Sequence, residues 1–264
     1  MSEHAMTIRE CSSVEDFQQC IDLERAVWRD DDIGIMPIRL YMISRACNAP
    51  TIGAFETSGR LVGFVHTMIA QVDGHIAYHS HLAAVLEEFR HKDIGFKLKR
   101  AQRQHAIENG VSLIFWTFDP LQSRNAHLNI NKLGAIVRRY EVNYYVEGLP
   151  TVFDSDVPSD RVFAEWWVSS AHVESVISGN RPRVEGEVET VLIPEDINAA
   201  RAGSVAEHLK WRLRVREDFT AKLSSGLIAR GFERLDGFGK YLLGSDERQF
   251  CFKEHLVKRN ETKS

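Results

Sequence analysis

The alternation of hydrophobic and polar residues in the first part of the chain predicts strands joined by tight turns. Segments with strand character occur at 7–9, 49–56, 61–71 and 77–85. Ser58-Gly59 and Asp73-Gly74 separate the last three of these segments and are typical of β-hairpins. Hydrophobic residues at helical spacing predict helices over about 13–28 and 38–46. We therefore expect antiparallel strands with helices beside them.

The later part of the chain shows the same mixture. A nearly continuous apolar run at 111–118 predicts a strand buried on both faces. A helix is expected from Ser123, as its N-cap, to about 133, followed by strands at 136–145 and 161–168 that pair with each other. Beyond a connector at 178–182, the pattern predicts a strand, a helix and two strands at 188–193, 204–223, 227–235 and 240–243. This last group either extends the sheet or forms a small second subdomain.

A strand, a short loop and a long helix occupy residues 77–110. The helix begins at about Ile94 and is ended by Asn109-Gly110. Its first amides have no partner within the helix, so they can bind an anion. Gly95 allows a ligand to approach the backbone, and positive charge is added there by Arg90, His91 and Lys92. The sequence therefore predicts a phosphate-binding turn.

This turn resembles the acyl-CoA signature of the GNAT superfamily of N-acetyltransferases, Arg/Gln-x-x-Gly-x-Gly/Ala. In this chain it reads Arg90-His91-Lys92-Asp93-Ile94-Gly95, and Val85 stands five residues before the arginine, as the last strand residue does in that family. Asp93 departs from the signature because it replaces the first glycine, and a carboxylate repels a pyrophosphate. The stretches 116–135, 138–145 and 158–167 also resemble a bacterial subgroup of predicted acyltransferases with a C-terminal extension.

The resemblance implies an α/β (α+β) fold. Its sheet would be mixed but mostly antiparallel, with a splayed V between the strands at 77–85 and 111–118, flanking helices, and a C-terminal strand–helix–strand extension. The implied domains are an acyltransferase domain over 1–170 and the extension over 171–264. The implied co-substrate is acyl-CoA, acetyl-CoA or succinyl-CoA, without a metal. The residues implied to bind it are Ala83, Val85, Arg90, His91, Lys92, Asp93, Ile94, Gly95, Phe96 and Asn125.

Composition narrows the possible functions. The chain has 264 residues and a formal net charge of -4, which argues against a general nucleic-acid binder. It contains no apolar run long enough to span a bilayer and no N-terminal signal peptide, so we expect a cytoplasmic protein without a membrane partner. The chain contains no CxxC pair, and we expect reduced thiols at Cys11, Cys20, Cys47 and Cys251.

His81 is the candidate general base for acyl transfer, either directly or through a water molecule. It lies four residues before Val85, where many members of the resembled family carry Glu. An imidazole titrates near neutral pH and can accept a proton from an ammonium group. His79 is expected on the same face of the strand, because residues two apart point the same way. The alternative is that His81 is a core histidine with satisfied hydrogen bonds.

Asp119 and Tyr140 are the other candidate catalytic residues. Asp119 follows the strand at 111–118 and either holds an acceptor ammonium or caps the turn at Pro120. The tyrosine that serves as general acid in the resembled family would fall at Ile130, which cannot donate a proton. That function is either absent or supplied by Tyr140, Tyr144 or Tyr145. These tyrosines alternatively pack or pair across the sheet.

Arginine side chains are the candidate ligands for a carboxylate on the acceptor or on the acyl group. A forked guanidinium suits this geometry, and the candidates are Arg138, Arg139 and Arg161, with surface ion pairing as the alternative. The implied reaction is direct attack by a small-molecule amine, such as an amino acid, on acyl-CoA in a ternary complex.

Other functions stay open at this point. Asp93 and Ile130 favour a non-catalytic acyl-CoA sensor or scaffold. The helix after the turn carries basic residues that either meet the 3′-phosphate and pyrophosphate of CoA or form a solvated face: Lys97, Lys99, Arg100 and Arg103. The same residues could contact nucleic acid, but the negative net charge disfavours this. In the helix at 204–223, an apolar stripe belongs either to a homodimer seam or to ordinary packing: Leu209, Leu213, Phe219 and Leu223.

Overall fold

The computed structural model describes residues 6–28, 34–90, 92–145, 157–182, 184, 186–199, 204–245 and 250–252. These residues form two compact units, the first covering the chain up to Ile114 and the second the described chain from Phe115 onward. β5 (Leu113–Phe118) crosses this division. The domain boundary expected at residue 170 came from the family resemblance and stays a prediction.

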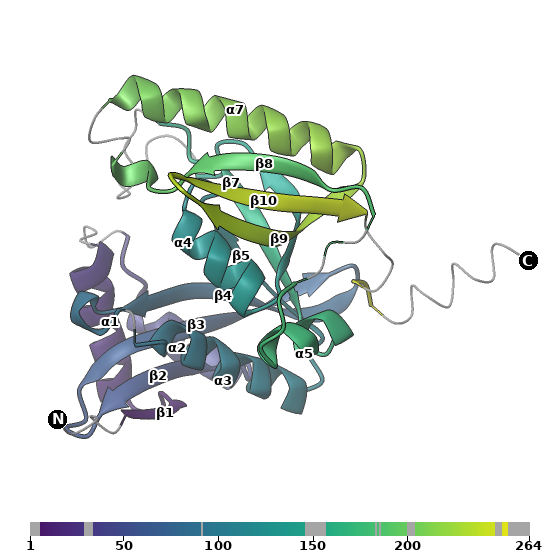
Figure 1. Ribbon diagram of the computed structural model, residues 1–264. Coiled ribbons are helices and arrows are strands. Elements are labelled where there is room, and N and C mark those ends of the chain that lie inside the picture. The colour runs from purple at the N-terminus through teal and green to yellow at the C-terminus, as the bar shows by residue number, and fades with distance from the viewer. Residues whose placement is uncertain are drawn as a thin grey trace, which may run out of the picture. The chain divides into compact units, whose positions relative to one another are not determined.

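The first unit contains an antiparallel sheet in the order β1-β2-β3-β4 (Figure 1). Its strands are β1 (Met6–Glu10), β2 (Thr51–Glu56), β3 (Leu61–Val72) and β4 (His75–Val85). The predicted hairpin between β3 and β4 is confirmed. Asp73 and Gly74 have φ values of 50° and 83°, the positive values that a two-residue hairpin loop requires, and Val72 pairs with His75. The predicted strands agree with these bounds to within two residues at each end.

Helices cover both faces of this sheet. They are α1 (Val14–Trp28), α2 (Ile38–Ala46) and α3 (Ile94–Glu108). Phe64 of β3 belongs to the hydrophobic cluster built by α1 and α2, whereas its neighbour Val65 belongs to the cluster built by α3. Successive strand residues point to opposite faces, so the two clusters lie on opposite sides of the sheet. Ser13 caps α1, because its hydroxyl accepts a hydrogen bond from the Asp16 amide at 3.1 Å.

The second unit contains strands in the order β5-β7-β6-β9-β10-β8, where β6 is Ile136–Glu141 and β7 is Arg161–Trp167. The predicted pairing of β6 with β7 is confirmed and antiparallel. The C-terminal elements are β8 (Glu189–Pro194), α7 (Val205–Ser224), β9 (Leu227–Leu235) and β10 (Phe238–Ser245). Val137 of β6 pairs with Ala229 of β9. The predicted strand–helix–strand extension is therefore present, and it extends the sheet of this unit.

Helices of the second unit differ from expectation in detail. The helix predicted from Ser123 is α4 (Ser123–Ala126) followed by a π-helical turn at His127–Lys132, and its N-cap is Gln122, so the prediction of Ser123 as cap was wrong. A further helix, α5 (Ala171–Ile177), was not predicted, and Ser170 caps it. In Figure 1, α7 lies across β8, β9 and β10 and covers one face of these strands.

The pairings given above are all antiparallel, which agrees with the predicted sheet, mixed but mostly antiparallel. The predicted V between β4 and β5 involves both units and stays a prediction.

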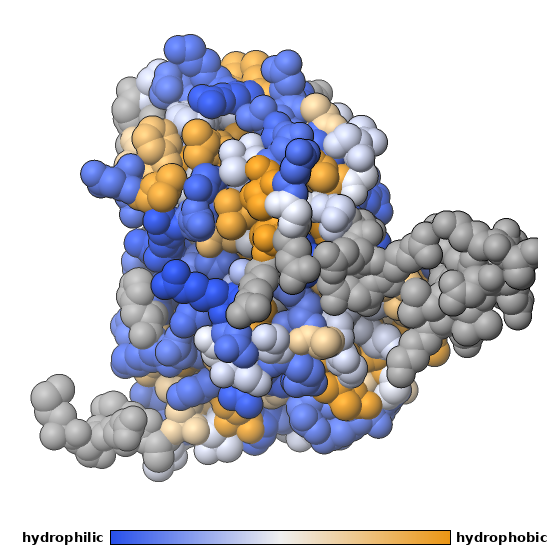
Figure 2. Space-filling view, turned by 45° about the vertical axis from the view of Figure 1, so that its right-hand side comes forward, coloured by the Kyte–Doolittle hydropathy of each residue, from blue (hydrophilic) through white to orange (hydrophobic). Residues whose placement is uncertain are grey.

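All four cysteines are free thiols, and Cys11 and Cys20 are buried. Hydrophobic side chains reach the surface among hydrophilic ones (Figure 2). The exposed hydrophobic residues include Leu40, Met42 and Ile43 of α2. Within the described residues, no helix combines the length and hydrophobicity needed to cross a membrane.

Candidate active site

The start of α3 leaves its first amides available to a ligand. Asp93 precedes the helix in the left-handed conformation, with φ 55° and ψ 18°, and its side chain makes no capping hydrogen bond. The first turn closes when the Lys97 amide donates to the Asp93 carbonyl at 2.9 Å. The amides of Ile94, Gly95 and Phe96 therefore have no acceptor within the helix. An anion placed here would meet these donors and the positive end of the helix dipole.

The surroundings of this turn leave room for a ligand and carry positive charge. A Cβ atom added to Gly95 would have no other heavy atom within 4 Å. Arg90 and Lys92 are exposed, and Lys92 places its ammonium group 4.4 Å from the ring centre of Phe89. His91, predicted to contact the coenzyme, lies outside the described residues. The turn thus combines open backbone, free space and cationic side chains, as its sequence predicts.

The backbone groups of Ala83 and Val85, which are predicted to bind acyl-CoA, are oriented away from the neighbouring strand β3. Ala83 lies opposite Val65 and Val85 lies opposite Gly63 in the pairing with β3. The amide of Leu86 donates to the carbonyl of Val62 at 2.9 Å. Alternate residues of an antiparallel strand direct their peptide groups to the same neighbour. The peptide groups of Ala83 and Val85 therefore point away from β3.

A β-bulge presents His81. In the register of β3 with β4, Thr67 pairs with Ser80, but His66 pairs with Leu82, so His81 is the extra residue. The strand bends at such a bulge and the extra side chain is turned outward from the regular alternation. His81 is accordingly exposed, whereas Ser80 beside it is buried.

Three imidazoles gather around this bulge. The ring centre of His81 lies 5.7 Å from that of His79 and 6.4 Å from that of His66. His66 is fully buried, with Nδ1 at 2.7 Å from the Thr51 hydroxyl and Nε2 at 3.3 Å from the Ser44 hydroxyl.

These imidazoles stay neutral at physiological pH. Burial and, to a smaller extent, the neighbouring titratable groups lower the pKa of His66 to about 3 and that of His79 to about 4. Burial also lowers the pKa of His81 below its ordinary value. His81 thus keeps part of its side chain exposed while its ring lies beside those of His79 and His66, and in its neutral form it can accept a proton.

Two residues near the bulge were missed or misjudged from the sequence. Lys99, grouped with exposed basic residues, is only 6% exposed and donates a hydrogen bond to Ser80 at 2.8 Å. It lies on the buried stripe of α3 with Ile94 and Leu98, and this helical spacing is the signal that could have found it. His66 carries no comparable signal, because its contacts depend on the packing of α2.

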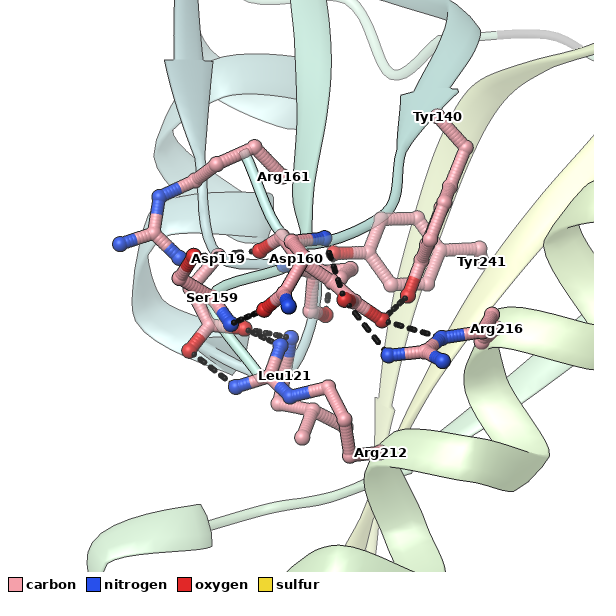
Figure 3. Close-up of polar contacts among 11 residues, drawn as sticks. Asp119, Leu121, Tyr140, Ser159, Asp160, Arg161, Arg212, Arg216 and Tyr241 are labelled. Carbon is pink, nitrogen blue, oxygen red and sulfur yellow. Dashed lines mark hydrogen bonds and ion pairs between the residues drawn. The ribbon is translucent and has the colours of Figure 1, made fainter. Parts of the chain in front are cut away.

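The second unit holds a separate cluster of charged residues (Figure 3). Asp119 accepts hydrogen bonds from Arg212 at 2.6 and 2.8 Å and from the Leu121 amide at 2.9 Å. The Tyr140 hydroxyl donates to Asp160 at 2.6 Å. Asp119 thus caps the turn at Pro120, one of the two functions expected for it. Its predicted catalytic function, like that of Tyr140, stays a prediction.

Electrostatics in this cluster oppose proton release from Tyr140. Burial raises the pKa of its hydroxyl, and the hydrogen bond to Asp160 raises it further. Burial alone would raise the pKa of Asp160, but hydrogen bonds from Arg216, at 2.9 Å each, and from Tyr140 lower it overall. The cluster therefore pairs an ionised carboxylate with a phenol that keeps its proton.

The predicted acceptor-binding arginines already contact protein groups. Arg138 donates to the Phe250 carbonyl at 2.9 Å and lies 3.2 Å from a carboxylate oxygen of Glu165. Arg161 is buried and donates to the Asp160 carbonyl at 2.9 Å. Asn125, expected to contact pantetheine, is exposed on α4. Their binding functions stay predictions. Across the described part of the chain, His, Cys, Asp and Glu form no group of three or more suited to a metal ion.

Comparison with known proteins gives distant structural matches only. No family model and no curated protein matches the chain. The ribosomal-protein-S18-alanine N-acetyltransferase from Escherichia coli is similar at 14% identity over 63% of this chain and 96% of its own, with a TM-score of 0.49. A GNAT family acetyltransferase from Elizabethkingia anophelis with acetyl-CoA bound is similar at 14% identity over 61% and 97% of the two chains, with a TM-score of 0.47. Likeness at this level assigns no activity.

Proposed function

We propose that this chain is an acyltransferase that moves an acetyl, succinyl or related acyl group from acyl-CoA to the amine of a small molecule. The observation that carries the proposal is the turn at the start of α3. Its unbonded amides, the open space at Gly95 and the cationic loop before it suit a pyrophosphate, and its sequence resembles the acyl-CoA signature.

The proposed reaction is direct attack within a ternary complex. The amine nitrogen of the acceptor forms a bond to the thioester carbonyl carbon, the carbon–sulfur bond breaks, and CoA leaves as a thiolate. The proton lost by the amine passes to His81, directly or through one water molecule. Three features support this assignment. Part of the His81 side chain is exposed, the partial burial of its ring beside His66 and His79 lowers its pKa and so favours the neutral form, and it lies on the strand that leads to the turn before α3.

The acceptor class rests on the sequence resemblance. An amino acid would bring a carboxylate, for which Arg138 and Arg161 are the proposed partners. Binding there requires the acceptor to displace or share existing contacts of these guanidinium groups. Asp119 and Tyr140 are weaker candidates for catalysis, since each is held by a short hydrogen bond within the second unit.

A non-catalytic acyl-CoA sensor is the second candidate function. Two observations favour it. Asp93 places a carboxylate at the phosphate turn, and Ile130, at the position of the family's general-acid tyrosine, is fully buried and has no proton to donate. Loss of that acid alone need not abolish turnover, because a thiolate is a tolerable leaving group.

One pair of measurements separates the two functions. Calorimetry with CoA, acetyl-CoA and succinyl-CoA tests binding, and release of free thiol from the acyl-CoAs in the presence of amino acids and other amines tests turnover. Turnover with any pair supports the enzyme. Binding without turnover, seen also as a gain of roughly 2.7 kcal/mol in unfolding free energy at 100 times the dissociation constant, supports the sensor. No binding at millimolar coenzyme overturns both.

A further inference from the structure

The bulge in β4 is flanked by a chain of side-chain hydrogen bonds with α3, whose two ends lie on paired residues of β3 and β4. Ser80 and Thr67 are the paired residues next to the bulge. Lys99 of α3 donates from Nζ to the Ser80 hydroxyl at 2.8 Å and to Oε1 of Gln102 at 3.3 Å. Gln102 in turn donates from Nε2 to the Thr67 hydroxyl at 2.8 Å. Ser80 and Thr67, the pair next to the bulge, are therefore both hydrogen-bonded to α3.

The pair on the other side of the bulge is anchored on the opposite face of the sheet, through the side chain of His66. His66 is the residue of β3 that pairs beyond the bulge, with Leu82. Its two ring nitrogens contact the hydroxyls of Thr51 and Ser44 at 2.7 and 3.3 Å. The backbone around His81 is thus fixed from both faces, by α3 on one side and by β2 and α2 on the other.

We propose that Lys99 is a positioning residue: by binding Ser80 it clamps the bulge and holds His81 in a fixed place relative to the anion site at the start of α3. The inference rests on the proposed function, because it assigns His81 the proton transfer. It goes further by linking the helix that would bind the coenzyme to the strand that would carry the base. The link is short, since Lys99 lies four residues after Gly95, about one helical turn.

The chemistry of the position supports a specific function for a lysine. The four hydrogen-bonded residues are all buried: Lys99, Gln102, Ser80 and Thr67. Burying polar groups costs free energy that apolar side chains at the same positions would not cost. A fully hydrogen-bonded buried network instead fixes one geometry. Burial also lowers the pKa of Lys99 to about 7, so the amine need not carry a full charge in the core at neutral pH.

The test compares three variants of the full chain. Lys99→Met keeps an unbranched side chain that ends before the position of the ammonium group and so removes the donor, and Ser80→Ala removes the acceptor with little change in volume. Lys210→Met, on a side chain that is 81% exposed on α7, is the control for loss of one lysine charge. For each variant we would measure amide hydrogen exchange at His81 and Leu82, the Kd for CoA by calorimetry, and kcat and KM for acyl transfer.

The clamp predicts a specific split among these measurements. In Lys99→Met and Ser80→Ala, exchange at the bulge should speed up about 10-fold or more, and kcat should fall about 10-fold or more. The Kd for CoA and the KM for acyl-CoA should each stay within about twofold of the wild-type value, since the turn at Gly95 is intact. Lys210→Met should resemble the wild type in all four. Unchanged exchange at the bulge in folded Lys99→Met and Ser80→Ala would overturn the clamp.

Failure of the proposed function gives a different result. If no acyl transfer is found with any acceptor, the exchange measurements still decide whether Lys99 holds the bulge, while the assignment of His81 as base is lost. If transfer occurs and exchange responds but kcat does not, the clamp exists but does not position the base, and the proposal is overturned in its functional part.

Discussion

The carboxylate of Asp119 and the guanidinium of Arg212 form a two-point ion pair, with N–O distances of 2.6 and 2.8 Å. Arg212 has a side chain that is only 3% exposed, although it lies on α7, a helix whose composition is mostly polar. The pair joins α7 to the turn after β5 within the second unit. A candidate catalytic carboxylate therefore has a clear structural function.

Replacing Arg212 with methionine should destabilise the protein strongly. The change removes a buried cation and leaves the Asp119 carboxylate without its principal partner, at a cost of about 3 kcal/mol or more. Urea unfolding of the variant measures this loss. Arg214→Met is the matched control, because its side chain is 58% exposed, and it should change the free energy of unfolding by less than about 0.5 kcal/mol. Equal effects of the two changes would contradict a stabilising function for the pair.

The ion pair also shows why the sequence misled for α7. The predicted apolar stripe contains Leu213, which is 48% exposed. Phe219 of the stripe is buried as predicted, but the other buried residues of α7 are His208, Arg212 and Val215. Hydrophobic spacing cannot reveal an arginine that is buried because a distant carboxylate, 93 residues away, meets it. The bounds of the helix depend on local propensity and were predicted within one residue at each end.

Asp93→Gly should leave the protein as stable or more stable, and CoA binding equal or tighter. A residue with a side chain is strained at φ 55°, though Asp tolerates this conformation better than most, whereas glycine adopts it without strain. The change also removes a negative charge next to the proposed pyrophosphate site. Thermal unfolding and calorimetry with CoA test both parts. A marked loss of CoA affinity would show that the carboxylate helps to bind the coenzyme.

Gly95 offers a direct test of the anion site. A Cβ atom added there meets no heavy atom within 4 Å apart from its chain neighbours and the backbone of its own helix, so a loss of coenzyme affinity would point to the ligand's need for that space. Gly95→Ala should stabilise α3 by about 0.5–1 kcal/mol through lower backbone entropy in the unfolded chain. Gly95→Val should raise the Kd for CoA about 10-fold or more while the protein stays folded. Calorimetry on both variants decides, and unchanged affinity in Gly95→Val would remove the site from this turn.

The phosphate turn and the bulge differ in how far sequence can predict them. The turn is local in sequence, since Arg90 and Lys92 directly precede α3 and Gly95 lies in its first turn. The bulge depends on the register between β3 and β4, which no pattern within β4 defines. His81 was therefore a reasonable candidate base from its position, but its display at a bulge and the contact of Lys99 with Ser80 required the folded structure.

The buried histidines predict a loss of stability in mild acid. In the unfolded chain an imidazole has a pKa near its ordinary 6.5, whereas folding lowers the pKa of His66 to about 3 and that of His79 to about 4. Between pH 6.5 and 4 the unfolded state therefore binds more protons, so the free energy of unfolding should fall as the pH falls. Urea unfolding at pH 7 and pH 4.5 measures the slope. His66→Asn should have a smaller slope than the wild type, and an identical slope would contradict the assignment.

His81 predicts the pH dependence of acyl transfer. A base must be neutral to accept a proton, and burial lowers the pKa of His81 from its ordinary 6.5. The midpoint of the acid limb of kcat should therefore lie below pH 6.5. Measuring kcat at saturating acceptor and acyl-CoA excludes titration of the free amine, because kcat reports the enzyme–substrate complex.

His81→Ala should lower kcat about 100-fold or more and abolish this acid limb, while the Kd for CoA stays within about twofold. His79→Ala is the control for loss of a nearby imidazole, because it leaves the bulge residue in place, and it should retain the limb. An acid limb that survives in His81→Ala would assign the titrating group elsewhere and leave His81 with a structural function only.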